Sequence, residues 1–327
     1  MIAGFTFILH LDPQYELAMK IYNMIKKPDT RIPDEPTKSL AHDSRFCIKY
    51  EDGCATWISD NTFNISLTKE ILSLAENVLF AVKTCKKYHK ERLPIISQTW
   101  GKAAFNVEYF SDAADVRYNT KVLPEVYRNT KVGHCLKTEA ILKYFNKNAM
   151  AKGWQWLIIT DDDTILGVHK ILEFLHHYNA KDPFIIGQRY GYRLSSETKG
   201  YDYIAGGAGI VYSLAMVAEI MKENGRYCSC PKPDEHDDMY LAGICIKNVG
   251  KSVLHSDRFH QNSPSDYSPD LLRNRDPISF HKFYNIDEEY GTLNWNNPRK
   301  TYNNYFKDSD EYLRMYKYSK QKHRHDL

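Results

Sequence analysis

The chain lacks a large excess of charge of either sign and lacks long apolar runs. Its 44 lysines and arginines exceed its 41 aspartates and glutamates by only three, which gives a formal net charge of +3 over 327 residues. Nucleic-acid-binding proteins usually carry a strong basic excess or patch, so we expect no nucleic-acid partner. No stretch approaches the about 20 apolar residues of a membrane-spanning helix. The composition therefore favours a globular protein that acts on a small or neutral substrate.

Paired CxxC blocks with zinc spacing are also missing. The seven cysteines lie at positions 47, 54, 85, 135, 228, 230 and 245. Because Cys228 and Cys230 are too close for a typical zinc knuckle, disulfide bonds in an oxidising compartment explain the cysteines better. The odd number leaves at least one thiol free. Asn64-Ile65-Ser66 would be a glycosylation acceptor in such a compartment, although such tripeptides also arise by chance.

The two ends of the chain bear on its location. Residues 1–11 are apolar but lack a basic leader and a clear cleavage site, so they do not have the pattern of a signal peptide. The last four residues, Arg324-His325-Asp326-Leu327, resemble the retrieval signals of the endoplasmic reticulum, with a merely polar tail as the alternative. We therefore predict the lumen of the endoplasmic reticulum and a retrieval receptor as partner, with a leader trimmed or missing from the gene model.

Apolar periodicity predicts one α/β domain with extensions on both sides. We expect strands over 77–84, 107–111 and 154–160, and helices near 94–100 and over 133–145 and 168–177. Strands that alternate with helices predict a mostly parallel sheet. The domain covers residues 71–295. Residues 1–70 are predicted to be an extension or a remnant of an upstream domain with a linker, and 296–327 to be a polar tail with little core potential.

Three adjacent acids, Asp161, Asp162 and Asp163, follow an apolar strand that ends at Thr160. Ligands of open α/β sheets bind outside the carboxyl ends of the strands. Adjacent carboxylates repel one another unless a cation or solvent compensates, and oxygen ligands suit Mg²⁺ or Mn²⁺ together with substrate phosphates. An acidic turn that caps the next helix is the alternative. The buried strand before the triplet favours the metal site.

A second acidic site, Asp237-Asp238, lies before another apolar segment. Such a carboxylate can be a general base for a hydroxyl acceptor, or it can cap a helix. His260 follows further along the chain, and a neutral imidazole could complete the ligand set of a metal. A hydrogen-bonded loop histidine is the alternative for that residue.

Gly206 and Gly207 belong to a glycine-rich segment, 206–209. Glycine lets the backbone approach a ligand closely, so we expect these two residues to bind the cofactor or donor. The segment lacks the lysine of a Walker loop and the spacing of a dinucleotide site. A tight turn without a ligand is the alternative.

An ordered series of motifs over about residues 77–290 resembles the fringe-like β1,3-glycosyltransferases. The motifs are Thr99-Trp100, Tyr109 to Asp112, the Asp triplet, Gly206 to Gly209, Asp237 to Met239, Phe259-His260 and Ile278 to Lys282. The resemblance implies a GT-A fold, which is a Rossmann-like mixed sheet flanked by helices. It also implies an enzyme that inverts the configuration of the sugar it transfers.

The resemblance further implies roles for individual residues. Asp163 and His260 would ligate Mn²⁺, and Asp161 and Asp162 would lie near the ribose and the metal. Asp238 would be the catalytic base, and the neighbouring Asp237 is the second candidate because the register of the paired acids is uncertain.

Within the family, some stretches are most similar to enzymes of the endoplasmic reticulum that extend O-linked fucose. Among these stretches are Ala81 to Lys87, Gly187 to Tyr192 and Ile278 to Asp287. Such enzymes move glucose from UDP-glucose to the fucose 3-hydroxyl on thrombospondin type 1 repeats. The expected partners are therefore a nucleotide-sugar donor and O-fucosylated glycoproteins.

Three alternatives stay open. UDP-N-acetylglucosamine or UDP-galactose could be the donor in a fringe-like or core 1-like transferase, because single hydroxyl contacts separate these sugars. A noncatalytic glycan-binding or folding factor of the secretory pathway is the alternative from another class. A two-metal hydrolase ranks last, since it would need more histidine and aspartate ligands than the motifs supply.

Overall fold

The computed structural model describes residues 45–50, 53–58, 70–124, 134–194, 200–282, 284–286, 293–295 and 298–306. The chain divides into two compact units, Met1–Phe63 and Asn64–Leu327. In the first unit, β1 (Arg45–Tyr50) and β2 (Gly53–Ile58) form an antiparallel pair. Within the described part of the chain, every helix is too short or too polar to cross a membrane.

Several predictions concern residues outside these ranges. They include most of the predicted linker, the glycosylation acceptor at Asn64 and the retrieval-like residues 324–327. The domain boundaries at residues 70 and 295 also stay predictions.

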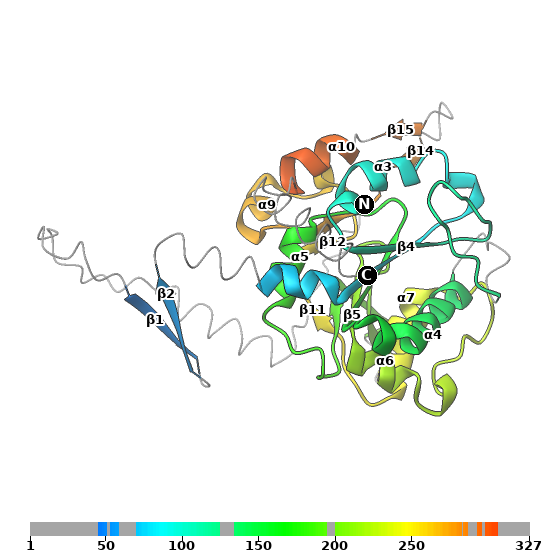
Figure 1. Ribbon diagram of the computed structural model, residues 1–327, viewed down its shortest axis with the longest axis horizontal. Helices are drawn as coiled ribbons and strands as arrows, with labels where there is room; N and C mark the ends of the chain where they lie inside the picture. Colours follow the sequence, from blue (N-terminus) through cyan, green and yellow to red (C-terminus); the bar gives the residue numbers. More distant parts are fainter. Residues whose placement is uncertain are drawn as a thin grey trace, which may run out of the picture. The chain divides into compact units, whose positions relative to one another are not determined.

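A six-stranded mixed sheet forms the centre of the second unit (Figure 1). Its strands are β3 (Val78–Lys83), β4 (Asn106–Phe110), β5 (Trp156–Asp161), β7 (Ile185–Gly187), β10 (Ile210–Ser213) and β11 (Leu254–His255). Their order is β11-β7-β10-β5-β3-β4. Pairs β4–β3, β3–β5 and β7–β11 are parallel, whereas β10 runs antiparallel to both of its neighbours. The predicted α/β class with a mixed sheet is therefore confirmed.

Helices cover both faces of this sheet, which explains why β3 and β5 read as continuous apolar runs. Successive residues of β3 belong alternately to two hydrophobic clusters, because side chains of a strand alternate between its faces. Residues of α3 (Leu93–Gln98) and α5 (Val168–Leu175) fill the first cluster. Those of α4 (Cys135–Lys152) and α6 (Leu214–Ile220) fill the second. These two helices lie side by side (Figure 1). All the predicted strands and helices of this region are present, with α4 longer than expected.

Smaller elements surround the carboxyl ends of the central strands. One small sheet is formed by β6 (Ile165–Leu166), β12 (Phe259–His260) and β13 (Ser279–Phe280). A hairpin is formed by β8 (Arg189–Tyr192) and β9 (Tyr201–Ile204). Three successive helical turns follow one another as α7 (Asp237–Met239), η5 (Tyr240–Ile244) and α8 (Cys245–Asn248). The remaining described elements include α9 (Pro269–Arg275), β14 (Tyr284–Ile286) and β15 (Leu293–Trp295). Among these smaller elements, α7 carries Asp237 and Asp238, and His281 directly follows β13.

The segment after residue 297 differs from the expected polar tail. In it, α10 (Pro298–Thr301) is followed by a helical turn, η7 (Tyr302–Phe306). Tyr302 and Phe306 are buried in the same core cluster as α5. Two aromatic residues four positions apart lie on one face of a helix, and here that face closes the core.

Candidate active site

The Asp triplet lies where the carboxyl ends of two parallel strands meet. The register of β3 and β5 places Lys83 opposite Asp161, the last residue of β5. Gly167 precedes α5, so the triplet does not supply that helix with its cap. The sequence-based expectation of a polar site at this edge of the sheet therefore holds for the placement of all three acids.

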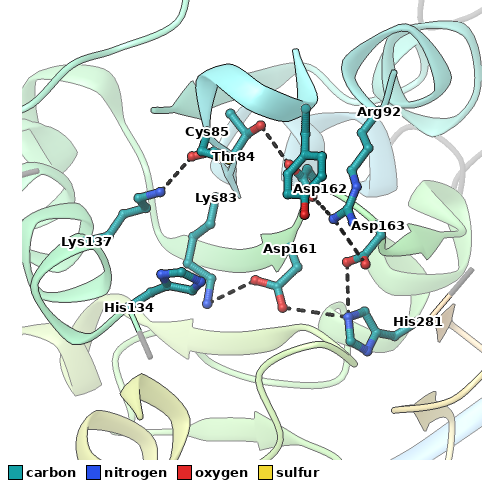
Figure 2. A pocket seen from close by; sticks show the side chains of 11 residues that line it. Lys83, Thr84, Cys85, Arg92, His134, Lys137, Asp161, Asp162, Asp163 and His281 are labelled. Carbon is teal, nitrogen blue, oxygen red and sulfur yellow. Dashed lines mark hydrogen bonds and ion pairs between the residues drawn. The ribbon is translucent and has the colours of Figure 1, made fainter. Parts of the chain in front are cut away.

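A pocket opens at this edge, and its lining mixes both signs of charge (Figure 2). The lining contains the three aspartates of the triplet and three basic side chains, Lys83, Arg92 and Lys137. Two histidines, His134 and His281, also belong to the lining. Burial, reinforced by the nearby Lys83, lowers the pKa of Lys137. Such a lining suits an anionic ligand that is held partly by protein cations and partly by a metal ion on the carboxylates.

Lys83 connects the two acidic motifs of the sequence. Its Nζ lies 3.1 Å from Oδ1 of Asp161 and 2.5 Å from Oδ2 of Asp237. Burial alone would lower the pKa of this ammonium, but the two carboxylates outweigh it and raise the pKa above its ordinary value. Burial likewise opposes ionisation of Asp161, yet Lys83 and His281 hold its pKa below the ordinary value. Asp161 is therefore an ionised carboxylate.

Asp162 is held by protein donors. The Thr84 hydroxyl donates to its Oδ2 at 2.7 Å, and Nη1 of Arg92 lies 2.5 Å from its Oδ1. Burial raises the pKa of Asp162 to about 6, although Arg92 favours the ionised form. Thr84 and Arg92 thus fix the orientation of the Asp162 carboxylate at the end of β5, and its predicted place near the ribose and the metal stays a prediction.

Asp161, Asp163 and His281 form the group that could hold a metal ion. One ligand atom from each lies within 4.8 Å of the others. Nε2 of His281 lies 3.1 Å from Oδ1 of Asp163 and 3.8 Å from Oδ2 of Asp161. Nδ1 of the same ring lies 3.1 Å from the carbonyl oxygen of Gln261. When Nδ1 carries the proton for that carbonyl, Nε2 turns its lone pair toward the carboxylates, as in many histidine ligands.

The donor set of two carboxylates and one imidazole fits a divalent ion such as Mn²⁺ or Mg²⁺. Burial disfavours a charge on His281, but Asp163 outweighs it and raises the pKa of the ring. Burial also disfavours ionisation of Asp163, yet His281 lowers its pKa. The carboxylates therefore favour a positive charge beside His281, at the position where a metal ion would bind.

His260, the predicted ligand, lies outside this group. It pairs with Phe280 across the small sheet, and its ring centroid lies 4.5 Å from that of Tyr267. Nδ1 of His260 lies 3.2 Å from the carbonyl oxygen of Arg258. The side chain is buried, and burial lowers its pKa. Its surroundings are those of a hydrogen-bonded histidine in an aromatic cluster, which was the structural alternative.

His281, which the sequence reasoning did not select, is the residue that reaches the carboxylates. It directly follows β13, the strand that pairs in parallel with the strand of His260. The sequence offered one signal for His281, because it lies within the motif Ile278 to Lys282 and directly follows Phe280.

Asp237 and Asp238 have different surroundings although they are adjacent. Asp237 is buried, and its Oδ2 accepts from Lys83 and, at 2.5 Å, from the Thr138 hydroxyl. Asp238 is half-buried; its carboxylate accepts from the backbone N–H of Gly206 at 3.1 Å and from that of Met239 at 2.8 Å. Burial, with the nearby charge of Asp237, raises the pKa of Asp238. Asp238 therefore has the greater proton affinity and fits a general base better.

The predicted glycines lie between Asp238 and the metal group. A Cβ on Gly206 would lie 3.4 Å from Cβ of Asp238, whereas a Cβ on Gly207 would lie 2.2 Å from Nδ1 of His281. Both glycines belong to the connection between β9 and β10. The candidate base therefore lies against Gly206, and the candidate metal ligand lies against the next residue, Gly207.

Two disulfide bonds hold the segment that carries Asp238. They join Cys135 to Cys230 and Cys228 to Cys245. The prediction of disulfides is therefore confirmed. Cys85, a residue of the pocket lining, is a buried free cysteine.

The fold and site define an α/β protein with a carboxylate–histidine group that could hold a metal ion, beside a pocket lined by both signs of charge, and with a separate candidate base. Residues 73–312 match the model of the Fringe-like family, and the chain belongs to that family.

The relatives of the chain are glycosyltransferases by name. The β-1,3-glucosyltransferase of Mus musculus is 41% identical over 223 residues, which are 68% of this chain and 44% of that protein. The enzyme of the same name from Homo sapiens is 41% identical over 239 residues, 72% of this chain and 44% of that protein. Fringe glycosyltransferase of Drosophila melanogaster is 23% identical over 212 residues, 57% of this chain and 50% of that protein. The chain spans about half the length of these relatives or less.

Proposed function

We propose that this chain is an inverting β1,3-glucosyltransferase that moves glucose from UDP-glucose to the 3-hydroxyl of O-linked fucose on thrombospondin type 1 repeats. The observation that carries the proposal is the Asp161–Asp163–His281 group beside a pocket with cationic side chains. The shared family and the 41% identity to two proteins named β-1,3-glucosyltransferase support glucose as the sugar.

Asp238 is the proposed base. It removes the proton of the fucose 3-hydroxyl while that oxygen forms a bond to the anomeric carbon of glucose. The bond from this carbon to the diphosphate breaks on the opposite face, and UDP leaves with the electron pair. A single displacement of this kind converts an α-linked donor to a β-linked product. Asp237, the second candidate, accepts hydrogen bonds from Lys83 and Thr138 and would hold the loop in place.

Asp163, His281 and Asp161 are the proposed Mn²⁺ ligands. His281 takes the role that the sequence predicted for His260. A bound divalent ion would offset the negative charge that develops on the departing diphosphate. Arg92 and Lys137 line the same pocket and would lie beside the phosphates. Gly206 and Gly207 would leave space for the side chains of Asp238 and His281. Direct contact of these glycines with the donor stays a prediction.

The compartment is part of the proposal. The two disulfides of the described residues fit an oxidising environment such as the lumen of the endoplasmic reticulum. The retrieval receptor as partner stays a prediction from the sequence.

Another donor is the second candidate function. More distant relatives, such as manic fringe of Danio rerio at 26% identity over 220 residues, are named β-1,3-N-acetylglucosaminyltransferases. A noncatalytic glycan-binding factor is the alternative of another class, but retention of both the metal group and a base with raised pKa favours an enzyme.

The test is transfer by the purified chain from UDP-glucose, UDP-galactose and UDP-N-acetylglucosamine to a fucosylated thrombospondin repeat, with Mn²⁺ or with EDTA. We expect Mn²⁺-dependent transfer from UDP-glucose alone. Transfer from another donor would remove the glucosyltransferase assignment. No transfer to a verified acceptor by a folded sample would favour the noncatalytic alternative.

A further inference from the structure

Four tyrosines occupy one face of the β8–β9 hairpin. The antiparallel register pairs Tyr190 with Tyr203 and Tyr192 with Tyr201. Because residues two apart in a strand point to the same side, all four side chains share a face. The ring centroids of Tyr190 and Tyr203 are 6.1 Å apart with an interplanar angle of 29°, and those of Tyr192 and Tyr201 are 5.4 Å apart. We call these four residues the tyrosine face.

The tyrosine face is partly open to solvent. Tyr190 is 38% exposed, and the other three rings are half-buried. Single exposed aromatic residues are common on proteins, whereas a contiguous group at the surface more often marks a binding site. Stacked tyrosines are amphipathic surfaces that need little ordering when a ligand binds.

One end of the tyrosine face adjoins the candidate base. The hairpin strand β9 contacts α7, the turn that contains Asp238, and packs closely on η5. A Cβ on Gly243 of η5 would lie 2.7 Å from Cβ of Tyr203. Two residues after β9, the Gly206 N–H binds the Asp238 carboxylate. The Asp238 charge adds to burial in raising the pKa of Tyr203, which agrees with this proximity.

The tyrosine face does not belong to the lining of the pocket with the Asp triplet. Asp238 is not part of that lining either, and the hairpin strand β9 contacts the turn that contains it. The carboxylate of a general base must lie within about 3 Å of the oxygen that carries the proton, so the sugar ring that bears the reacting hydroxyl must lie against Asp238 and its neighbours. Tyr203, followed outward by Tyr190, supplies a flat apolar surface there.

We propose that the tyrosine face binds the terminal sugar ring of the acceptor, with the C–H surface of the ring stacked on Tyr190 and Tyr203. This inference rests on the proposed function, since it takes Asp238 as the base. A 6-deoxyhexose such as fucose suits the site, because its methyl group enlarges the apolar surface that an aromatic ring can cover.

The test compares Tyr190→Ala with wild type in the full chain, with saturating UDP-glucose and Mn²⁺. We expect the KM for the acceptor to rise about tenfold, which corresponds to about 1.4 kcal/mol. The KM for UDP-glucose and the slow hydrolysis of UDP-glucose without acceptor should stay unchanged. Tyr190→Phe, which keeps the ring, should stay within twofold of wild type. Tyr227→Ala removes another exposed tyrosine, 50% exposed, and is the matched control.

Two acceptors separate sugar binding from polypeptide binding. Methyl α-fucoside and a fucosylated thrombospondin repeat should lose affinity by the same factor in Tyr190→Ala. A loss with the repeat alone would overturn the proposal, because the tyrosine face would then bind polypeptide. An unchanged acceptor KM, or a matching loss of UDP-glucose hydrolysis, would also overturn it.

The proposed function can fail separately. If wild type transfers no sugar, calorimetric binding of the fucosylated repeat to wild type and to Tyr190→Ala decides the matter directly. Weaker binding by the variant would preserve the acceptor site without catalysis. Equal binding, or none by wild type, would remove the acceptor site as well.

Discussion

Gly207→Ala is the substitution whose effect follows most directly from the geometry of the site. The added Cβ would lie 2.2 Å from Nδ1, 2.3 Å from Cε1 and 2.6 Å from Cγ of His281. Ordinary contact between such atoms is about 3.5 Å, so the ring must move by roughly 1 Å or more. Gly207 does not have a positive φ, and the conflict is therefore with the imidazole rather than with the backbone conformation.

The displaced ring should weaken metal binding strongly. Loss of a hydrogen-bonding partner behind a ligand already costs about 10-fold to 100-fold in metal affinity, so displacement of the ligand itself should cost at least about tenfold. A misplacement of about 1 Å can also cost about a hundredfold in rate. We expect both effects in Gly207→Ala, measured as Mn²⁺ affinity by electron paramagnetic resonance of free Mn²⁺ and as kcat for transfer.

The neighbouring glycine supplies the control. A Cβ on Gly206 would meet its nearest atom, Cβ of Asp238, at 3.4 Å, which is close to ordinary contact. Gly206→Ala should therefore bind Mn²⁺ within about threefold of wild type. If folded Gly207→Ala also kept wild-type Mn²⁺ affinity, His281 would not be a ligand and the reasoning from the glycine pair would be refuted.

Further predictions concern the two histidines and the base. His281→Gln should lower Mn²⁺ affinity, measured by calorimetry, at least about tenfold. His260→Gln should change this affinity little, because His260 lies in an aromatic cluster. The opposite order of the two affinities would restore His260 as the ligand. Asp238→Asn should lower kcat by about a hundredfold or more while UDP binding persists, and a fully active variant would remove Asp238 as base. Because burial raises the pKa of Asp238 and only the ionised form accepts a proton, kcat/KM at saturating Mn²⁺ should fall with decreasing pH through a value above the ordinary aspartate pKa of about 4. A midpoint at or below 4 would contradict this assignment.

The placement of the Asp triplet could be predicted because its signal is local. An apolar run that ends at Thr160 and is followed directly by acids indicates the end of a buried strand. The same local patterns predicted β3, β4 and β5 and the helices between them. The sequence predicts a site at Asp237-Asp238, but the division of roles between the two residues depends on partners far along the chain. Lys83, the partner of Asp237, is separated from it by 154 positions.

The choice between two histidines could not be made from sequence. His260 and Phe280 are neighbours across the small sheet, and His281 lies one residue beyond the end of the adjacent strand. Which ring reaches the carboxylates depends on that register and on the space that Gly207 leaves, and neither has a local signature. The tail was a different case: the spacing of Tyr302 and Phe306 was visible, but the polar residues around them concealed a buried helical face.

The two disulfides divide the site into halves with different requirements for assembly. Asp161, Asp163 and His281 come from segments of the sheets that neither cystine joins, whereas both cystines anchor the loop of Asp238. A newly made chain in a reducing environment could gather its metal ligands before the base is fixed in place. Thiol oxidation would then act as a maturation step, after which a chain whose candidate metal ligands are already together gains a fixed position for the proposed base.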